Sequence, residues 1–160
     1  MTGVDISEGM LKVGEKKIEE LNLNSVISLK VDDCENLSFE DNTFDAAFIA
    51  FGIRNFEDKK KGLKELHRVL KPNGLLLILE LSVPQNKILL SLYKLYFLHI
   101  LPFIGKKISG DNKAYTYLPQ SVMNFPKPKD FLQTMEECGF KDVRQKALTF
   151  GLCRMYEGKC

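Results

Sequence analysis

The chain of 160 residues carries 23 Lys and Arg against 21 Asp and Glu, a formal net charge of +2 with both signs interspersed. Such a balance excludes the strongly basic surface of a nucleic-acid-binding domain, so we expect no nucleic-acid partner. With 44% hydrophobic and 28% charged residues, the composition is that of one globular domain over residues 1–160.

The four cysteines are widely separated, and none forms a CxxC pair or stands at ligand spacing from a histidine. Neither a disulfide framework nor a zinc site is therefore expected, and the chain is predicted to hold no metal. The opening residues, MTGVD, have the pattern of a strand rather than of a secretory leader. We expect a cytoplasmic protein.

The first elements alternate between strand and helix. Residues 2–5 have the pattern of the end of a strand, and Ser7 is a good N-cap for a following helix. Leu11 and Ile18 fall on one face of that helix. Residues 26–31, VISLKV, alternate apolar and polar side chains, which predicts a second strand.

Residues 44–50, FDAAFIA, predict a strand covered on both faces, which ends in a loop that carries Arg54. A charged group at the carboxyl end of a strand stands where open α/β sheets bind ligands. The next helix has an apolar stripe that contains His67, expected to be packed rather than catalytic, and residues 72–74 would end this helix. Residues 75–81, LLLILEL, predict another strand buried on both faces.

An apolar segment over residues 88–104 is interrupted by Lys94, His99 and Pro102. It is shorter than the ~20 apolar residues that a membrane-spanning helix needs. Two interpretations stay open: a buried or amphipathic helix, or a cover for a lipophilic substrate that touches a bilayer surface.

The last part of the chain begins with a loop-rich stretch over residues 105–129. Asp130 is then expected to cap a short helix that Gly139 ends. Two strands, near residues 143–150 and 153–158, close the chain.

Strand–helix alternation followed by an antiparallel pair predicts an α/β, doubly wound, mostly parallel Rossmann-like sheet. Such a sheet normally begins with a strand and a glycine-rich turn that lets the backbone approach the ligand. No turn of that kind precedes residues 2–5. We therefore expect a single domain that lacks its first strand.

Several strings point together to one family: GVDISEGM, LKVDDCENLSFEDNTFD, AFGIRNF, VLKPNG, AYTYLPQSV and LTFGLC. With them the chain resembles, over essentially its whole length, the class I S-adenosylmethionine-dependent methyltransferases, and among these the UbiE-type C-methyltransferases of menaquinone and ubiquinone synthesis. AFGIRNF followed by YTYLPQSV is the most specific combination. The resemblance implies S-adenosyl-L-methionine as cofactor, a prenylated quinol as substrate, and a substrate lid inserted over residues 85–129.

The resemblance assigns Asp5, Met10 and Ala50 to the cofactor site. Asp5 would accept hydrogen bonds from the ribose hydroxyls, although an Asp there also serves to cap the next turn. Met10 would lie against the adenine, with core packing as the alternative. Ala50, at the end of the strand 44–50, completes this part of the set.

The turn after the second strand supplies the rest of the implied cofactor site. Asp33 would accept from the adenine amino group, and the backbone N–H of Cys34 would donate to the ring. Asp32 competes with Asp33 for that role, and a pair of turn carboxylates is otherwise often just solvated.

Arg54 and Asn55 are the implied catalytic residues. A ring carbon becomes nucleophilic when a neighbouring quinol hydroxyl loses its proton. Arg54 stays protonated, so it would stabilise the phenolate or position a water rather than act as the base, while Asn55 would orient the quinol or that water. Tyr115 and Tyr117, in the lid, are further substrate candidates.

Other interpretations compete with this enzyme. Arg54 is alternatively explained by an ion pair with Glu57 or Asp58 in its own loop. Without a glycine loop the chain is alternatively a catalytically incomplete fragment that acts as a binding or assembly module, and the acceptor is alternatively another small molecule. Peripheral contact with the inner face of the membrane and a homodimer are compatible with the resemblance, which does not choose between naphthoquinol and benzoquinol rings.

Overall fold

The structure is a computed structural model that describes residues 1–100 and 112–160, without the side chains of residues 98, 99 and 112–116. Its strands are β1 Thr2–Asp5, β2 Ser28–Val31, β3 Phe44–Ala50, β4 Leu70–Leu81, β5 Lys141–Leu148 and β6 Cys153–Lys159. Its helices are α1 Glu8–Glu20, α2 Lys59–Val69, α3 Lys87–Leu95, α5 Asn112–Asn124 and α6 Pro128–Glu137. The 3₁₀ turns are η1 Ile53–Asn55 and η3 Thr149–Gly151, and a π-helical turn covers Tyr96–Ile100.

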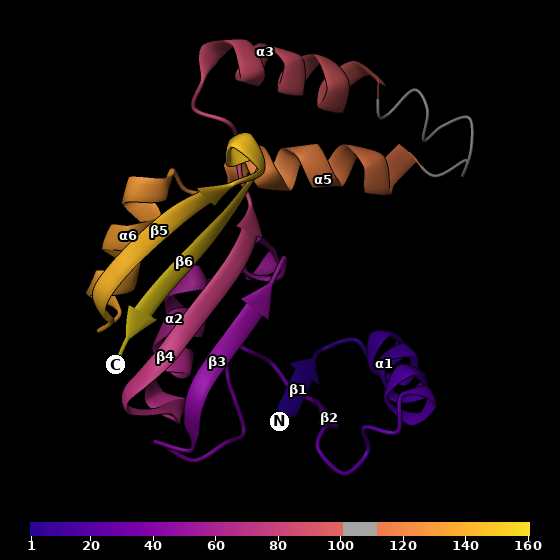
Figure 1. The fold of residues 1–160 in the computed structure, drawn as a ribbon, viewed down its shortest axis with the longest axis vertical. Coiled ribbons are helices and arrows are strands. Elements are labelled where there is room, and N and C mark those ends of the chain that lie inside the picture. The colour runs from indigo at the N-terminus through magenta and orange to yellow at the C-terminus, as the bar shows by residue number, and fades with distance from the viewer. Residues whose placement is uncertain (101–111) are drawn as a thin grey trace.

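The described strands form two sheets (Figure 1). β1 pairs in parallel with β2, and the larger sheet has the order β3-β4-β6-β5, in which β3 and β4 are parallel and β6 is antiparallel to both of its neighbours. These pairings confirm the α/β class and the C-terminal antiparallel pair. No described strand lies between β1 and β3, so one edge of each is open.

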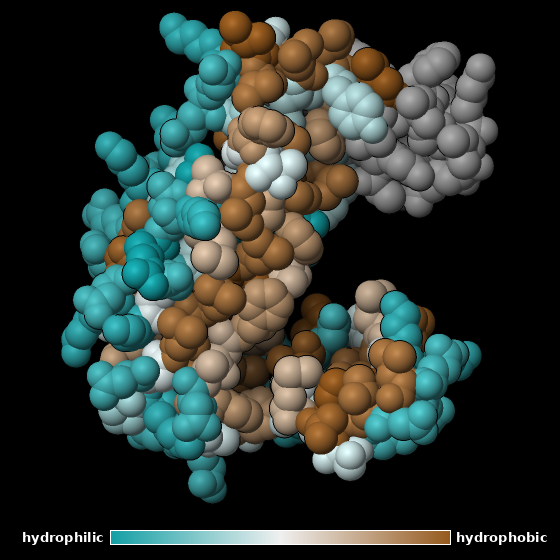
Figure 2. All heavy atoms as spheres, viewed as in Figure 1, coloured by the Kyte–Doolittle hydropathy of each residue, from teal (hydrophilic) through white to brown (hydrophobic). Residues whose placement is uncertain are grey.

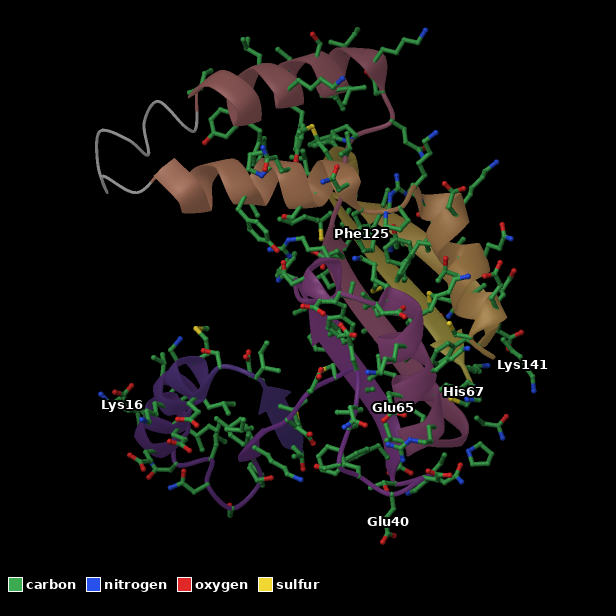
Figure 3. The ribbon with its side chains drawn as sticks, turned by 180° about the vertical axis from the view of Figure 1, so that it is seen from behind. Lys16, Glu40, Glu65, His67, Phe125 and Lys141 are labelled. Atoms are coloured by element: carbon green, nitrogen blue, oxygen red, sulfur yellow. The ribbon has the colours of Figure 1, made fainter. Side chains whose placement is uncertain are left out.

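Helices α2 and α6 cover one face of the larger sheet, and the hydrophobic core lies between these helices and the sheet (Figures 1 and 3). Its largest fully buried apolar side chains come from both helices, from η1 and from the central strands: Ile53, Leu63, Leu70, Leu76, Ile78, Phe131, Met135 and Tyr156. This layer holds β3, β4 and η1 in place, which positions the residues that follow β3.

The other face of this sheet is open, contrary to the prediction that residues 44–50 and 75–81 are buried on both faces. Phe48 is 62% exposed and Leu75 is 39% exposed, whereas Leu76 and Ile78 on the opposite face are fully buried. Figure 2 shows hydrophobic atoms gathered over the open face. The apolar pattern correctly predicts the two strands, but nothing in the described residues covers this second face.

Other boundaries also differ from the sequence predictions. Helix α2 ends at Val69, and residues 72–74 lie inside β4 rather than closing the helix. α6 begins at Pro128 with Lys127 as its N-cap, because proline is well suited to the first helical turn, so Asp130 lies in that turn and does not cap it. Gly139, with φ of 104°, ends α6 as predicted.

Helices α3 and α5 form an arm beyond the carboxyl ends of β3 and β4 (Figure 1). α5 occupies part of the stretch predicted to be loop-rich, and it contacts η1. The molecule is hollowed between this arm and the unit of β1, α1 and β2 (Figure 2). Within the described residues no helix is both long enough and apolar enough to cross a membrane.

Candidate functional site

The chain turns sharply where β3 ends. Phe51 has φ of 55°, in the left-handed region that a bulky side chain rarely adopts. Its backbone N–H donates to the carbonyl of Leu79 in β4 at 2.8 Å, and the fully buried Ile53 anchors η1 in the core. The loop that carries the predicted catalytic residues is therefore fixed at the carboxyl end of the strand.

Arg54 turns back toward this junction and pairs with a buried acid. Its Nη1 donates to Glu80 Oε1 at 2.8 Å and also to the carbonyl of Phe51, and its backbone N–H donates to Glu80 Oε2 at 3.1 Å. The Arg54 side chain is 11% exposed and that of Glu80 is fully buried. The partner is thus Glu80 in β4, and the interpretation of a pair with Glu57 or Asp58 is wrong.

Asn55 and Tyr117 meet although they are far apart in the sequence. The Tyr117 hydroxyl donates to Asn55 Oδ1 at 2.8 Å, and both side chains are exposed. The structure therefore brings together η1 and α5, the two elements predicted to hold the substrate. The side chain of Tyr115 lies outside the described residues.

Asp5 and Asp33 gather around Cys34 at the carboxyl ends of β1 and β2. Burial raises the pKa of the Cys34 thiol to about 11, and the nearby carboxylates of Asp33, Asp32 and Asp5 add to the rise. Asp5 Oδ1 accepts from the Ser7 N–H at 2.8 Å, so Asp5 does stabilise the next turn. Its other carboxylate oxygen receives no donor from the described residues.

The two neighbouring turn carboxylates have different surroundings. The Asp32 side chain is 8% exposed and accepts from the backbone N–H of Ser38 at 3.1 Å and from the Ser38 hydroxyl at 2.6 Å. Asp33 is exposed, and only its Oδ1 is engaged, by the Glu35 N–H at 2.8 Å. The geometry leaves Asp33 available to a ligand and commits Asp32 to its own turn.

Met10 and Ala50 are also accessible. Met10 is 62% exposed near the start of α1, so the alternative that it packs in the core is wrong. Ala50 is exposed at the last position of β3, on the same face as Phe48. Neither side chain is taken up by core packing.

The carboxylate of Glu35 links the loop after β2 to the loop after η1. Glu35 Oε1 accepts from the backbone N–H groups of Glu57 at 2.7 Å and Asp58 at 3.2 Å. Glu35 follows the Asp33–Cys34 turn, and Glu57 follows η1. The predicted cofactor side and substrate side are therefore joined by the Glu35 side chain, which binds the backbone of the loop after η1.

Glu80 is the functional candidate that the sequence interpretation missed. Its only signal was a single carboxylate in the otherwise aliphatic run LLLILEL. His67, in contrast, packs as predicted: its ring lies edge-on to Phe140 with centroids 5.2 Å apart, and Gly139 lies against it. In the part of the chain that the structure describes, no three His, Cys, Asp or Glu side chains are placed to hold a metal ion.

Comparison with known proteins decides the family. The model of the ubiE/COQ5 methyltransferase family matches residues 1–159. The chain belongs to this family. Demethylmenaquinone methyltransferase of Bacteroides fragilis is 46% identical over 98% of the chain, and the UbiE ubiquinone/menaquinone biosynthesis C-methyltransferase of Geobacter sulfurreducens is 42% identical over 99%. The chain spans 64% of the first of these relatives and 62% of the second.

A solved structure supports the fold independently. Phosphoethanolamine N-methyltransferase 2 of Haemonchus contortus, in complex with S-adenosyl-L-methionine, superposes with a TM-score of 0.70 at 16% identity, over 99% of this chain and 42% of that one. At this identity the likeness concerns the fold alone, because one fold hosts many activities. It confirms the predicted Rossmann-like methyltransferase fold.

Proposed function

We propose that the protein is an S-adenosyl-L-methionine-dependent C-methyltransferase that methylates the ring of a prenylated quinol, converting demethylmenaquinol to menaquinol or acting at the equivalent ubiquinone step. The observation that carries the proposal is the junction after β3, where Arg54 and the hydrogen-bonded pair Asn55–Tyr117 stand together. Membership of the ubiE/COQ5 family and the names of the relatives support the same reaction.

The acceptors at the ends of β1 and β2 fit the proposed cofactor. Ribose hydroxyls and an adenine amino group are hydrogen-bond donors, and Asp5 and Asp33 each keep a carboxylate oxygen without a donor among the described side chains and backbone. Met10 offers an exposed thioether near the start of α1, and the Cys34 N–H follows Asp33 directly. When bound, S-adenosyl-L-methionine supplies an electrophilic methyl group.

The residues after β3 would prepare the quinol. Arg54 lies in a nearly buried position, where the N–H groups of its guanidinium that do not bind Glu80 or Phe51 would donate to the phenolate oxygen. Asn55 and Tyr117 offer amide and hydroxyl groups that orient the ring or a water accepting the quinol proton. None of these groups has to lose a proton itself.

We also propose that a further segment completes the sheet, so that residues 1–160 are the larger part of one methyltransferase domain. The open edges of β1 and β3 both belong to parallel strands, and a strand between them would satisfy their free backbone groups. The same further segment would also cover the open apolar face of the sheet around Phe48.

Residues 85–129 would serve as the substrate lid, with α3 as its membrane-facing helix. Exposed apolar side chains recur along one side of α3 and the turn that follows: Ile88, Leu92, Leu95, Tyr96 and Ile100. This spacing gives an amphipathic helix that can lie in a bilayer interface, where a quinol with an isoprenoid tail resides.

The direct test is methyl transfer by the full gene product. With isotopically labelled S-adenosyl-L-methionine, we expect the label in menaquinol when demethylmenaquinol is the acceptor, and none in unrelated phenols. Labelling of an unrelated acceptor alone would change the proposed substrate. No transfer to any quinol would favour the alternative of a binding or assembly module.

A further inference from the structure

Glu80 is a carboxylate where the fold alone would favour a hydrocarbon. It is fully buried at the end of β4, in a strand whose neighbouring positions are leucine and isoleucine. Replacing a buried ion pair with apolar residues of similar volume often leaves a protein as stable or more so. The stability of the core therefore does not explain a glutamate at this position.

Two of the three hydrogen bonds that Glu80 accepts come from Arg54. Its Oε1 accepts from Arg54 Nη1 at 2.8 Å and from the Leu81 N–H at 2.8 Å, while its Oε2 accepts from the Arg54 backbone N–H at 3.1 Å. The same carboxylate thus fixes both the main chain and the side chain of Arg54. The Glu80 carboxylate therefore restrains both ends of the flexible arginine side chain.

A second buried arginine lies beside Glu80 but is bound elsewhere. Arg154 of β6 is directly opposite Glu80 in the sheet register and is 4% exposed. Its Nη1 donates to Gln145 Oε1 of β5, and it makes no hydrogen bond to Glu80. The Glu80 side chain therefore binds the guanidinium of Arg54 and not that of Arg154, its neighbour across the strands.

We propose that Glu80 is the positioning residue of the methyl-transfer site, holding the Arg54 guanidinium at the fixed place where the quinolate forms. This inference rests on the proposed function. Both hydrogens of Arg54 Nη1 are used to hold it, on Glu80 and on the Phe51 carbonyl, and Nε is buried, which leaves Nη2 as the donor to the substrate oxygen. Glu80 acts only through Arg54 and does not touch the quinol, because its side chain is fully buried.

The test compares Glu80→Gln with Glu65→Gln in the full gene product. Glu65 is a matched control: it binds Arg68 at 2.7 Å and the Leu37 N–H at 3.0 Å, but it lies on α2, away from η1 (Figure 3). We expect Glu80→Gln to lower kcat for demethylmenaquinol by about 30-fold or more, with KM and cofactor affinity nearly unchanged. Glu65→Gln should keep the wild-type kcat.

Double substitution separates positioning from folding. In Arg54→Gln/Glu80→Gln both buried charges are gone, so the stability lost in either single variant should be regained. We expect the turnover to equal that of Arg54→Gln alone, because Glu80 has no other route to the reaction. A return of turnover together with stability would show a merely structural role, and a loss multiplying that of Arg54→Gln would show a role independent of Arg54.

A spectroscopic measurement covers the outcome in which Glu80→Gln folds poorly. In Glu80→Asp the charge stays but the carboxylate is withdrawn by one methylene. The ¹⁵N guanidinium signals of Arg54 should show slow rotation in the wild type and fast rotation in Glu80→Asp, with kcat reduced in parallel. Unchanged Arg54 signals and unchanged kcat would overturn the inference, whereas a wild type without methyl transfer would instead refute the proposed function.

Discussion

At the level of single residues, the two turn aspartates differ in burial and in hydrogen bonding although they are neighbours in the sequence. Asp32 receives three hydrogen bonds from its own turn, two from Ser38 and one from the Asp33 N–H. Asp33 is exposed and keeps one oxygen available. The resemblance assigned the adenine contact to Asp33 and kept Asp32 as a competitor, because the difference in their hydrogen bonding depends on how the turn closes on Ser38.

We predict that Asp33→Asn weakens binding of S-adenosyl-L-methionine to the full gene product by about 10-fold, since one hydrogen bond to a charged acceptor is weakened. Asp32→Asn should leave the affinity nearly unchanged and lower the free energy of unfolding by about 1–2 kcal/mol. Calorimetric titration and urea unfolding of both variants check this. Loss of affinity in Asp32→Asn alone would reverse the assignment.

The pH dependence of stability should follow the same difference. Burial acts to raise the pKa of Asp32, but the hydrogen bonds from Ser38 and the Asp33 N–H outweigh it, so the pKa is lowered. Because the pKa of Asp32 is lowered in the folded state, its stabilising effect is complete above the unfolded pKa of ~3.9. The effect is lost as the pH falls through the folded pKa. Asp32→Asn should therefore flatten the loss of stability on acidification below about pH 4. An unchanged slope would contradict this.

At the level of elements, the sequence predicted what local patterns dictate and missed what packing decides. The short strands, the stop at Gly139 and the strand that leads to Arg54 all follow from period and turn chemistry. The burial of residues 44–50 and 75–81 on both faces did not hold, because an apolar pattern tells which side chains need a cover and not where the cover comes from. The Arg54–Glu80 contact joins two elements 26 positions apart, beyond the reach of local patterns.

Helix α3 offers a test of the proposed membrane contact. Ile88→Ser/Leu92→Ser/Leu95→Ser removes three exposed apolar side chains and should lower partition onto phosphatidylethanolamine–phosphatidylglycerol vesicles by about 10-fold or more. Val13→Ser/Leu21→Ser, which removes exposed apolar side chains from α1 and its C-cap, is the control and should sediment with vesicles like the wild type. Equal binding of all three proteins would remove α3 from the membrane contact.

At the level of the whole molecule, the open edges of β1 and β3 bear on how the cofactor site is completed. If a further strand and its turn are required, the chain of residues 1–160 alone should show no saturable heat with S-adenosyl-L-methionine at concentrations that saturate the full gene product. Asp5 and Asp33 would then supply only part of the contacts. Tight binding by residues 1–160 alone would show that no further strand is needed.

At the junction after β3 the chain presents a fixed guanidinium next to the hydrogen-bonded pair of Asn55 and Tyr117. Arg54→Lys keeps a positive charge next to Glu80 but loses the planar fork that holds two partners at once. The most direct measurement is the single-turnover rate of methyl transfer to demethylmenaquinol by this variant at saturating cofactor. We predict a fall of about 30-fold or more with an unchanged unfolding midpoint. A rate equal to that of the wild type would contradict the assignment of the chemistry to this junction.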